Sequence, residues 1–135
     1  MMIRIFVVDD HAEVREGVKR ITEDTEDLRV TGEASTGQEV VEQMVNQAWD
    51  VVLLDITMPG QSGLEVLHHL TQTYPSLPVL MFSVHSEPRY AAQAFKAGAA
   101  GYLTKDSSEE LVGALRQVAQ GGRYVSSALA EYLDL

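Results

Sequence analysis

The stretch from Val51 to Gly60, VVLLDITMPG, constrains the fold of this chain more than any other feature. Its first four residues are apolar and two of them are β-branched, which is typical of a strand buried on both faces in a parallel sheet. Pro59 and Gly60 end the strand. Because an ionised carboxylate is costly in a protein interior, we expect Asp55 at the carboxyl edge of the sheet, where α/β proteins bind ligands. Taken alone, Asp55 also fits a solvated residue where a strand meets its loop.

Strand-like and helical patterns alternate along the rest of the chain. Apolar, β-branched runs predict further strands at residues 3–8, 28–34, 78–83 and 100–105. Apolar residues at helical spacing predict five helices that begin near residues 12, 36, 62, 87 and 107. Thr36 with Glu39, and Ser107 with Glu110, fit capping boxes at two of these starts. Five strands alternating with five helices predict an α/β fold, a doubly wound five-stranded parallel sheet with helices on both faces.

Polar side chains lie at or just past the carboxyl ends of four predicted strands, and a parallel sheet brings these ends to one edge. They are Asp9, Asp10, Asp55, Ser83 and Lys105. Two carboxylates about 4 Å apart repel by roughly 4 kcal/mol at an effective dielectric near 20, so three together need a cation or a bound proton. Mg²⁺ suits such a site, because it prefers oxygen ligands and keeps positions free for phosphate oxygens.

This set of residues points to phosphoryl transfer. With Mg²⁺ and Lys105 beside it, the Asp55 carboxylate could attack phosphorus and form an acyl phosphate. Lys105 would stabilise charge on the transferring oxygens, and the Ser83 hydroxyl could donate a hydrogen bond to the phosphoryl group. His11 is expected at the rim of the acidic pocket.

Composition narrows the remaining choices. The net charge of −10 argues against DNA binding by this segment, because duplex affinity comes largely from Lys and Arg that neutralise phosphates. The absence of cysteine excludes disulfides and thiolate metal sites. Apolar runs are too short to cross a membrane, and the chain enters a strand-like run at Ile3 without a leader, so we expect a cytoplasmic protein with no membrane partner.

With these residues in place, the chain resembles the receiver domain of two-component response regulators over residues 3–122. The resemblance is carried by Asp9-Asp10, by Asp55 within LDITMPG, and by Ser83, Tyr102 and Lys105. It implies a flavodoxin-like (CheY-like) fold with strand order 2-1-3-4-5. It also implies that Asp55 accepts phosphate from a sensor histidine kinase, in a domain that catalyses its own phosphorylation and dephosphorylation and is otherwise no enzyme.

The same resemblance implies a role for each site residue. Asp10, Asp55 and the main-chain carbonyl of Thr57 would bind Mg²⁺ directly, and Asp9 would act through water. Ser83 and Tyr102 correspond to the switch pair, in which the hydroxyl moves to the phosphoryl group and the aromatic ring turns inward. Asp106 follows Lys105 where most receivers have Pro, so we expect a trans peptide there.

Three further motifs resemble the NarL/FixJ subfamily, whose members carry a LuxR-type helix-turn-helix domain after the receiver. They are DDH with VREG after it, GAAGYLTKD, and GGRYVS near the end. We therefore expect a receiver domain at residues 1–122, and at residues 123–135 a tail or the start of a linker to a DNA-binding domain that this sequence does not contain. Homodimerisation on phosphorylation is a further expectation of the resemblance. A stand-alone receiver is the alternative.

Two other functions fit parts of the pattern. A phosphohydrolase of the haloacid dehalogenase type also uses a strand-end Asp and Mg²⁺, but its second Asp would stand where this chain has Thr57. A nucleotide-binding flavodoxin-like module or an unphosphorylated pseudo-receiver is the other choice. No P-loop or G-x-G-x-x-G follows the first predicted strand, and a pseudo-receiver would be expected to lack one of the five matched positions.

Overall fold

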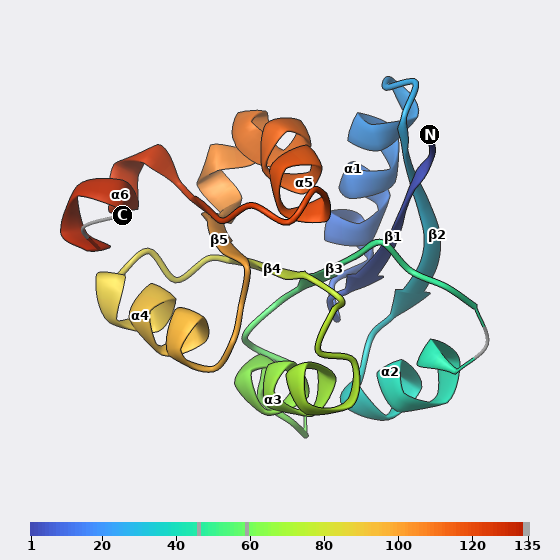
Figure 1. Cartoon of the computed structure of the whole chain (residues 1–135), viewed down its shortest axis with the longest axis horizontal. Helices are drawn as coiled ribbons and strands as arrows, with labels where there is room; N and C mark the ends of the chain where they lie inside the picture. Colours follow the sequence, from blue (N-terminus) through green and yellow to red (C-terminus); the bar gives the residue numbers. More distant parts are fainter. Residues whose placement is uncertain (46, 59, 134–135) are drawn as a thin grey trace.

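One parallel sheet forms the centre of the computed structural model, which describes every residue except 46, 59 and 134–135 (Figure 1). Its strand order is β2-β1-β3-β4-β5-β6. The strands are β1 (Ile3–Val8), β2 (Leu28–Ala34), β3 (Val51–Leu54), β4 (Val79–Ser83), β5 (Gly101–Thr104) and β6 (Tyr124–Val125). The order of the first five strands confirms the prediction, and with it the doubly wound α/β class.

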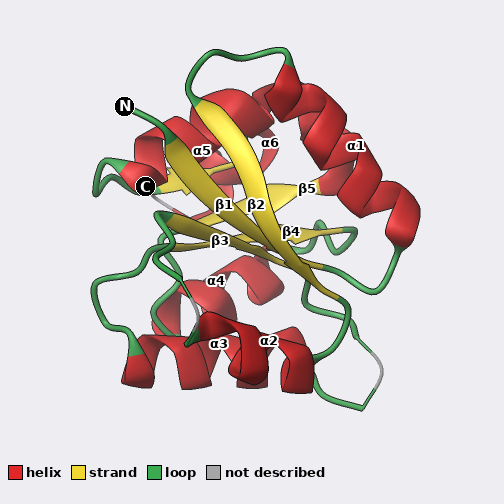
Figure 2. Ribbon diagram, turned by 90° about the vertical axis from the view of Figure 1, so that its right-hand side faces the viewer, coloured by secondary structure: helices red, strands yellow, loops and turns green. Residues whose placement is uncertain are grey.

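Helices cover both faces of this sheet. They are α1 (Ala12–Glu23), α2 (Gly37–Met44), α3 (Gly63–Thr73), α4 (Pro88–Lys96), α5 (Leu111–Ala119) and α6 (Ser127–Leu133), with a 3₁₀ helix, η1, at Lys105–Glu110. Figure 2 shows α1 and α5 on one side of the strands and α2, α3 and α4 on the other. Each side has its own hydrophobic cluster. Among the described residues, no helix is long and apolar enough to cross a bilayer.

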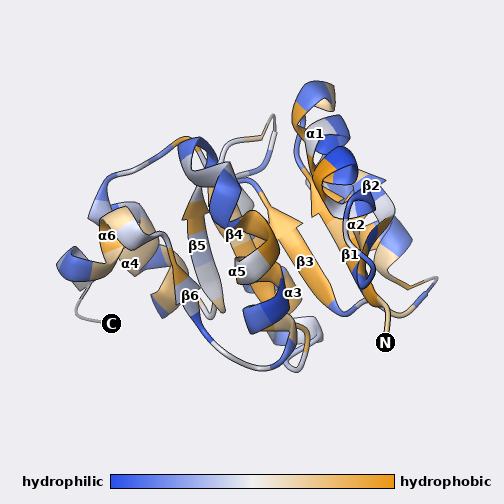
Figure 3. Cartoon of the chain, turned by 90° about the horizontal axis from the view of Figure 1, so that it is seen from above, coloured by the Kyte–Doolittle hydropathy of each residue, from blue (hydrophilic) through white to orange (hydrophobic). Residues whose placement is uncertain are grey.

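Burial explains why the central strands read as continuous apolar runs. All residues of β3, β4 and β5 are buried, so their side chains alternate between the two clusters and both faces must be apolar. Figure 3 shows hydrophobic colour concentrated on β1 and β3, whereas α1 alternates between hydrophobic and hydrophilic turns. Burial on both faces holds these strands rigidly, so the polar residues at their carboxyl ends have fixed positions.

Local capping signals set two helix starts as predicted. The Thr36 hydroxyl accepts a hydrogen bond from the Glu39 N–H at 3.2 Å, and the Glu39 carboxylate accepts one from the Ser35 N–H at 3.1 Å. The Ser62 hydroxyl accepts one from the Leu64 N–H and begins α3. These contacts satisfy backbone donors that have no partner inside the helix.

The capping box predicted at Ser107 and Glu110 is wrong. This segment forms η1, and α5 begins only at Leu111. Glu110 instead faces the end of the chain, where its carboxylate accepts hydrogen bonds from the Tyr124 hydroxyl at 2.5 Å and the Ser127 N–H at 3.2 Å. The Glu110 carboxylate therefore binds residues beyond α5 and does not cap an α-helix that begins at Ser107.

The prediction of five strands also requires correction, because β6 is a sixth. Two residues are too few to show the alternation that identifies a strand in a sequence. The strand is formed by hydrogen bonds to β5 and its start, from the Tyr124 N–H to the Ala100 oxygen at 3.1 Å and from the Ser126 N–H to the Tyr102 oxygen at 3.0 Å. Helix α6 follows, contacts α4, and buries Leu129.

Candidate functional site

The acidic pair lies in the turn between β1 and α1. Asp9 is only 2% exposed. Its N–H donates to the Ala34 oxygen of β2 at 3.0 Å, and one of its carboxylate oxygens, Oδ1, accepts a hydrogen bond from the His11 N–H at 2.9 Å. The turn is therefore held by the Asp9 side chain itself, as is common where Asp precedes a helix.

Asp55 follows β3 and is 3% exposed, so it does not lie in open solvent as the alternative interpretation allowed. Its N–H donates to the Val8 oxygen at 3.0 Å, which places it beside the acidic pair. The Lys105 ammonium lies 2.8 Å from Asp9 Oδ2 and 3.5 Å from Asp55 Oδ2. The carboxyl ends of three strands thus bring two buried carboxylates to a single cation.

Burial and charge alter the protonation equilibria of this site. Burial, together with the charge of Asp9, raises the pKa of Asp55 above its ordinary value, and Lys105 offsets this only in part. The hydrogen bond to Asp9 and the charge of Asp10 raise the pKa of His11. Asp55 is therefore a carboxylate whose charge is not fully compensated by its neighbours.

The donor set fits a hard cation. Asp9, Asp10, His11 and Asp55 each contribute an atom to a group that spans no more than 4.8 Å. Asp10 Oδ1 is buried and makes no hydrogen bond to any described residue, although it lies 3.2 Å from His11 Nδ1 without hydrogen-bond geometry. A buried carboxylate oxygen without a donor is costly, and an oxygen-ligated ion such as Mg²⁺ would satisfy it. That the Thr57 carbonyl is a metal ligand remains a prediction.

His85 connects the other predicted residues and was not singled out by sequence for this role. The buried Ser83 hydroxyl accepts a hydrogen bond from the His85 N–H at 3.1 Å, and the Tyr102 hydroxyl donates to the His85 oxygen at 2.6 Å. Across the site, Thr57 Oγ1 lies 2.9 Å from His85 Nε2. The His85 ring also stacks on Tyr90 with 4.4 Å between centroids. Its place in the loop after a site strand, two residues past Ser83, is a sequence signal for a position near the site.

All five matched positions, with the acidic pair counted as one, thus reach one edge of the sheet. Lys105 contacts both Asp9 and Asp55, and Ser83 and Tyr102 each form a hydrogen bond with His85. The Tyr102 ring is fully buried, with its hydroxyl directed to the loop after β4. No cis peptide occurs among the described residues, so the Lys105–Asp106 bond is trans as expected.

Comparison with known proteins gives a consistent result. The response regulator receiver domain family matches residues 5–116. The response regulator UvrY of Escherichia coli K12 is 42% identical over 99% of this chain and 62% of its own length. GacA of Pseudomonas aeruginosa is 42% identical over 99% of the chain and 63% of its length. The chain therefore spans a little over three fifths of these relatives.

Solved structures agree in fold. A two-component response regulator of the LuxR family from Aurantimonas sp. SI85-9A1 matches with a TM-score of 0.93 and 35% identity, covering 99% of this chain and 96% of that one. The isolated receiver domain of Salmonella enterica RcsB, solved with the phosphomimetic BeF₃⁻, matches at 0.89 over 97% and 98% of the two chains. Its identity of 19% bears on the fold alone.

Proposed function

This chain belongs to the response regulator receiver domain family, and from that premise we propose that Asp55 accepts a phosphoryl group from a sensor histidine kinase. The observation that carries the proposal is the contact of Lys105 with both Asp55 and Asp9 at the carboxyl edge of the sheet. A buried carboxylate beside a cation and a second carboxylate is suited to attack phosphorus, because its charge is only partly neutralised at rest.

In the proposed reaction an Asp55 oxygen forms a bond to phosphorus as the phosphorus–nitrogen bond of the donor histidine breaks. The histidine nitrogen keeps the bonding electron pair. Mg²⁺, held by Asp10, Asp55 and the Thr57 carbonyl, with Asp9 acting through water, would supply positive charge to the phosphoryl oxygens. Lys105 would leave its resting contact with Asp55 to pair with a phosphoryl oxygen. Slow hydrolysis of the acyl phosphate in the same site would reset the domain.

Ser83 and Tyr102 form the proposed switch. The Ser83 oxygen accepts from the His85 N–H, and in the switched state its own proton would be donated to a phosphoryl oxygen. Because the His85 oxygen also accepts from Tyr102, a movement of Ser83 toward the phosphoryl group would be felt at Tyr102. The Tyr102 ring is fully buried, which supports the proposal that this ring occupies an inward position in the switch.

The proposed output is transcriptional and acts through another domain. Residues 1–122 would form the receiver, and residues 123–135 would lead to a LuxR-type helix-turn-helix domain. The net charge of −10 supports assigning DNA contact to that output domain. A structure of RcsB contains two dimers bound to DNA, which supports homodimerisation as a proposal here, and we propose that phosphorylation promotes it. We propose that the domain acts in the cytoplasm, because its phosphoryl donor would be a kinase that takes phosphate from ATP.

Intact mass measured after incubation with acetyl phosphate tests the proposal. We expect the wild type to gain one phosphoryl group in Mg²⁺ and none in EDTA, and Asp55→Asn to gain none. Asp24→Asn, a change at an exposed residue that follows α1, is the matched control and should behave as the wild type. Equal gain by Asp55→Asn and the wild type would show that the acceptor lies elsewhere.

A further inference from the structure

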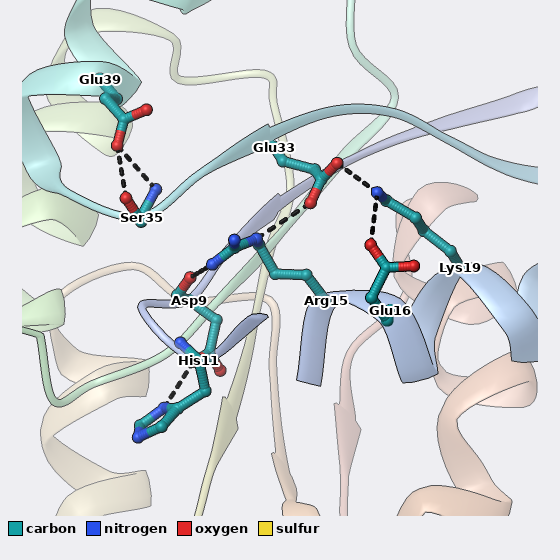
Figure 4. Close-up of polar contacts among 8 residues, drawn as sticks. All are labelled: Asp9, His11, Arg15, Glu16, Lys19, Glu33, Ser35 and Glu39. Carbon is teal, nitrogen blue, oxygen red and sulfur yellow. Dashed lines mark hydrogen bonds and ion pairs between the residues drawn. The ribbon is translucent and has the colours of Figure 1, made fainter. Parts of the chain in front are cut away.

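Arg15, on the first turns of α1, contacts the backbone of the acidic turn and not its carboxylates (Figure 4). One guanidinium nitrogen, Nη1, donates to the main-chain oxygen of Asp9 at 2.6 Å, and Nε donates to Glu33 Oε1 at 2.9 Å. These two are the hydrogen bonds that the Arg15 side chain makes to described residues. The side chain therefore connects strand β2, where Glu33 lies, to the turn between β1 and α1.

Glu33 is itself fixed by a second cation. Lys19 Nζ pairs with the other oxygen of Glu33 and lies 3.1 Å from Glu16 Oε1. Burial is the largest single influence on the pKa of Glu33 and raises it. The two cations Lys19 and Arg15 together outweigh burial, so the pKa of Glu33 is lowered. An ionised Glu33 held on both oxygens gives the Arg15 guanidinium a fixed orientation, and the planar guanidinium carries that orientation to Asp9.

The contact at the Asp9 oxygen bears on Asp10. The peptide group between the two residues is planar, so a hydrogen bond to the Asp9 oxygen fixes the rotation of the whole group and the direction in which Asp10 leaves the turn. The other polar groups of Asp9 are already engaged: its N–H by Ala34, and its two carboxylate oxygens by His11 and Lys105. Arg15 completes the set, while the Asp10 carboxylate keeps one oxygen without a hydrogen-bond partner.

We propose that Arg15 is a positioning residue for the proposed metal and phosphoryl site, which acts by holding the Asp9–Asp10 peptide so that Asp10 presents its carboxylate to the cation. The inference rests on the proposed function. The inference and simple electrostatics predict opposite changes in Mg²⁺ affinity when Arg15 is replaced by a neutral residue. By electrostatics alone, removal of a positive charge near a cation site should strengthen Mg²⁺ binding. Loss of a positioning contact should weaken it, as loss of outer contacts to metal ligands commonly does by about 10- to 100-fold.

The test is isothermal titration calorimetry with Mg²⁺ on the unphosphorylated protein, a readout that needs no phosphoryl transfer. The variants are Arg15→Met, Arg15→Lys and Glu33→Gln, with Arg20→Met as the control. Arg20 lies on the same helix and is exposed, and its side chain makes no hydrogen bond or ion pair to a described residue. Arg15→Lys keeps the charge and removes the guanidinium fork, and Glu33→Gln tests the orientation in a chain that retains Arg15.

We expect the Mg²⁺ dissociation constant to rise at least about tenfold in Arg15→Met and Arg15→Lys, to rise less in Glu33→Gln, and to stay unchanged in Arg20→Met. Thermal unfolding in EDTA confirms that each variant is folded, and if Arg15→Met is not, Arg15→Lys and Glu33→Gln decide. An unchanged or lower dissociation constant in the folded Arg15 variants would overturn this inference alone. Failure of the wild type to bind Mg²⁺ would overturn the metal site of the proposed function and this inference with it.

Discussion

The Tyr102 hydroxyl donates a 2.6 Å hydrogen bond to the main-chain oxygen of His85, and this contact joins the buried centre of β5 to the loop that follows Ser83. The N–H of the same residue, His85, donates to the Ser83 hydroxyl. A single residue of the loop therefore contacts both members of the proposed switch. The position of the Tyr102 ring and the hydrogen bonding of Ser83 should change together.

Replacement of Tyr102 by Phe should remove this link while keeping the buried ring. We expect a loss of about 1 kcal/mol in the free energy of unfolding, because the His85 oxygen loses its donor. Urea unfolding at pH 7 measures it. Tyr132→Phe is the control, since Tyr132 is 65% exposed and should show no loss. Equal stability of Tyr102→Phe and the wild type would mean that the contact contributes nothing to folding.

Stability at alkaline pH should depend on the same hydroxyl. Burial raises the pKa of Tyr102 from 10.0 to about 12. Because the folded-state pKa lies above the unfolded one, the contribution of this group is present below pH 10 and is lost as pH rises toward 12. The unfolding free energy of the wild type should therefore fall more steeply over this range than that of Tyr102→Phe. Parallel curves would show that Tyr102 does not titrate as its burial implies.

Asp55→Asn should stabilise the protein at neutral pH in the absence of Mg²⁺. The pKa of Asp55 is raised in the folded state, so folding favours its protonated form, and stability from this group is lost as pH rises through the folded-state pKa. The advantage of Asn should disappear below the ordinary Asp pKa of 3.8, where both residues are neutral. Thermal unfolding from pH 3 to 7 measures the difference. Added Mg²⁺ should reduce it, because the ion stabilises the folded wild type.

Two glycine substitutions should have opposite effects. A Cβ at Gly63 would lie 1.9 Å from the main-chain oxygen of Asp55 and 2.6 Å from the Cα of Ile56. Since these are backbone atoms, Gly63→Ala should cost about 2 kcal/mol or more and displace Asp55. At Gly17, within α1, nothing lies within 4 Å, so Gly17→Ala should stabilise by roughly 0.5 to 1 kcal/mol. Urea midpoints of both variants decide, and similar midpoints would contradict the packing at Gly63.

Glu110→Gln should loosen the end of the chain without affecting the centre of the sheet. The hydrogen bond from the Tyr124 hydroxyl, aided by those from Ser127, lowers the pKa of Glu110. A depressed folded-state pKa contributes stability above the ordinary Glu pKa of 4.5, and this is lost as pH falls through the folded-state value. Amide exchange of Ser126 should therefore quicken in Glu110→Gln at pH 7, and in the wild type on acidification.

The matched control for this experiment is Glu109→Gln, because Glu109 is exposed and adjacent. Its exchange rates should equal those of the wild type at pH 7, and amides of β3 should be unchanged in both variants. Unchanged exchange at Ser126 in Glu110→Gln would show that the hydrogen bonds to β5, and not Glu110, hold β6 in place.

The alternation of strands and helices, and the collection of polar residues at strand ends, were determined by the sequence alone. Continuous apolar runs mark strands buried on both faces, and a parallel sheet must bring the ends of such strands to one edge. That argument placed Asp9, Asp55 and Lys105 together without any knowledge of distances, and the ion-pair contacts confirm it. It could not assign which carboxylates the lysine contacts.

The tertiary structure alone decided the contacts whose partners lie far apart in the chain. Glu110 fits a local cap by spacing, yet it binds Tyr124 and Ser127, 14 and 17 residues away. No sequence pattern relates Arg15 to residues of other elements, yet its side chain joins Glu33 to the backbone of Asp9. Periodicity reports which face of an element is buried, and it carries no information on which polar groups meet across elements. Those pairings arise only when the sheet has closed and each buried donor and acceptor must find a partner.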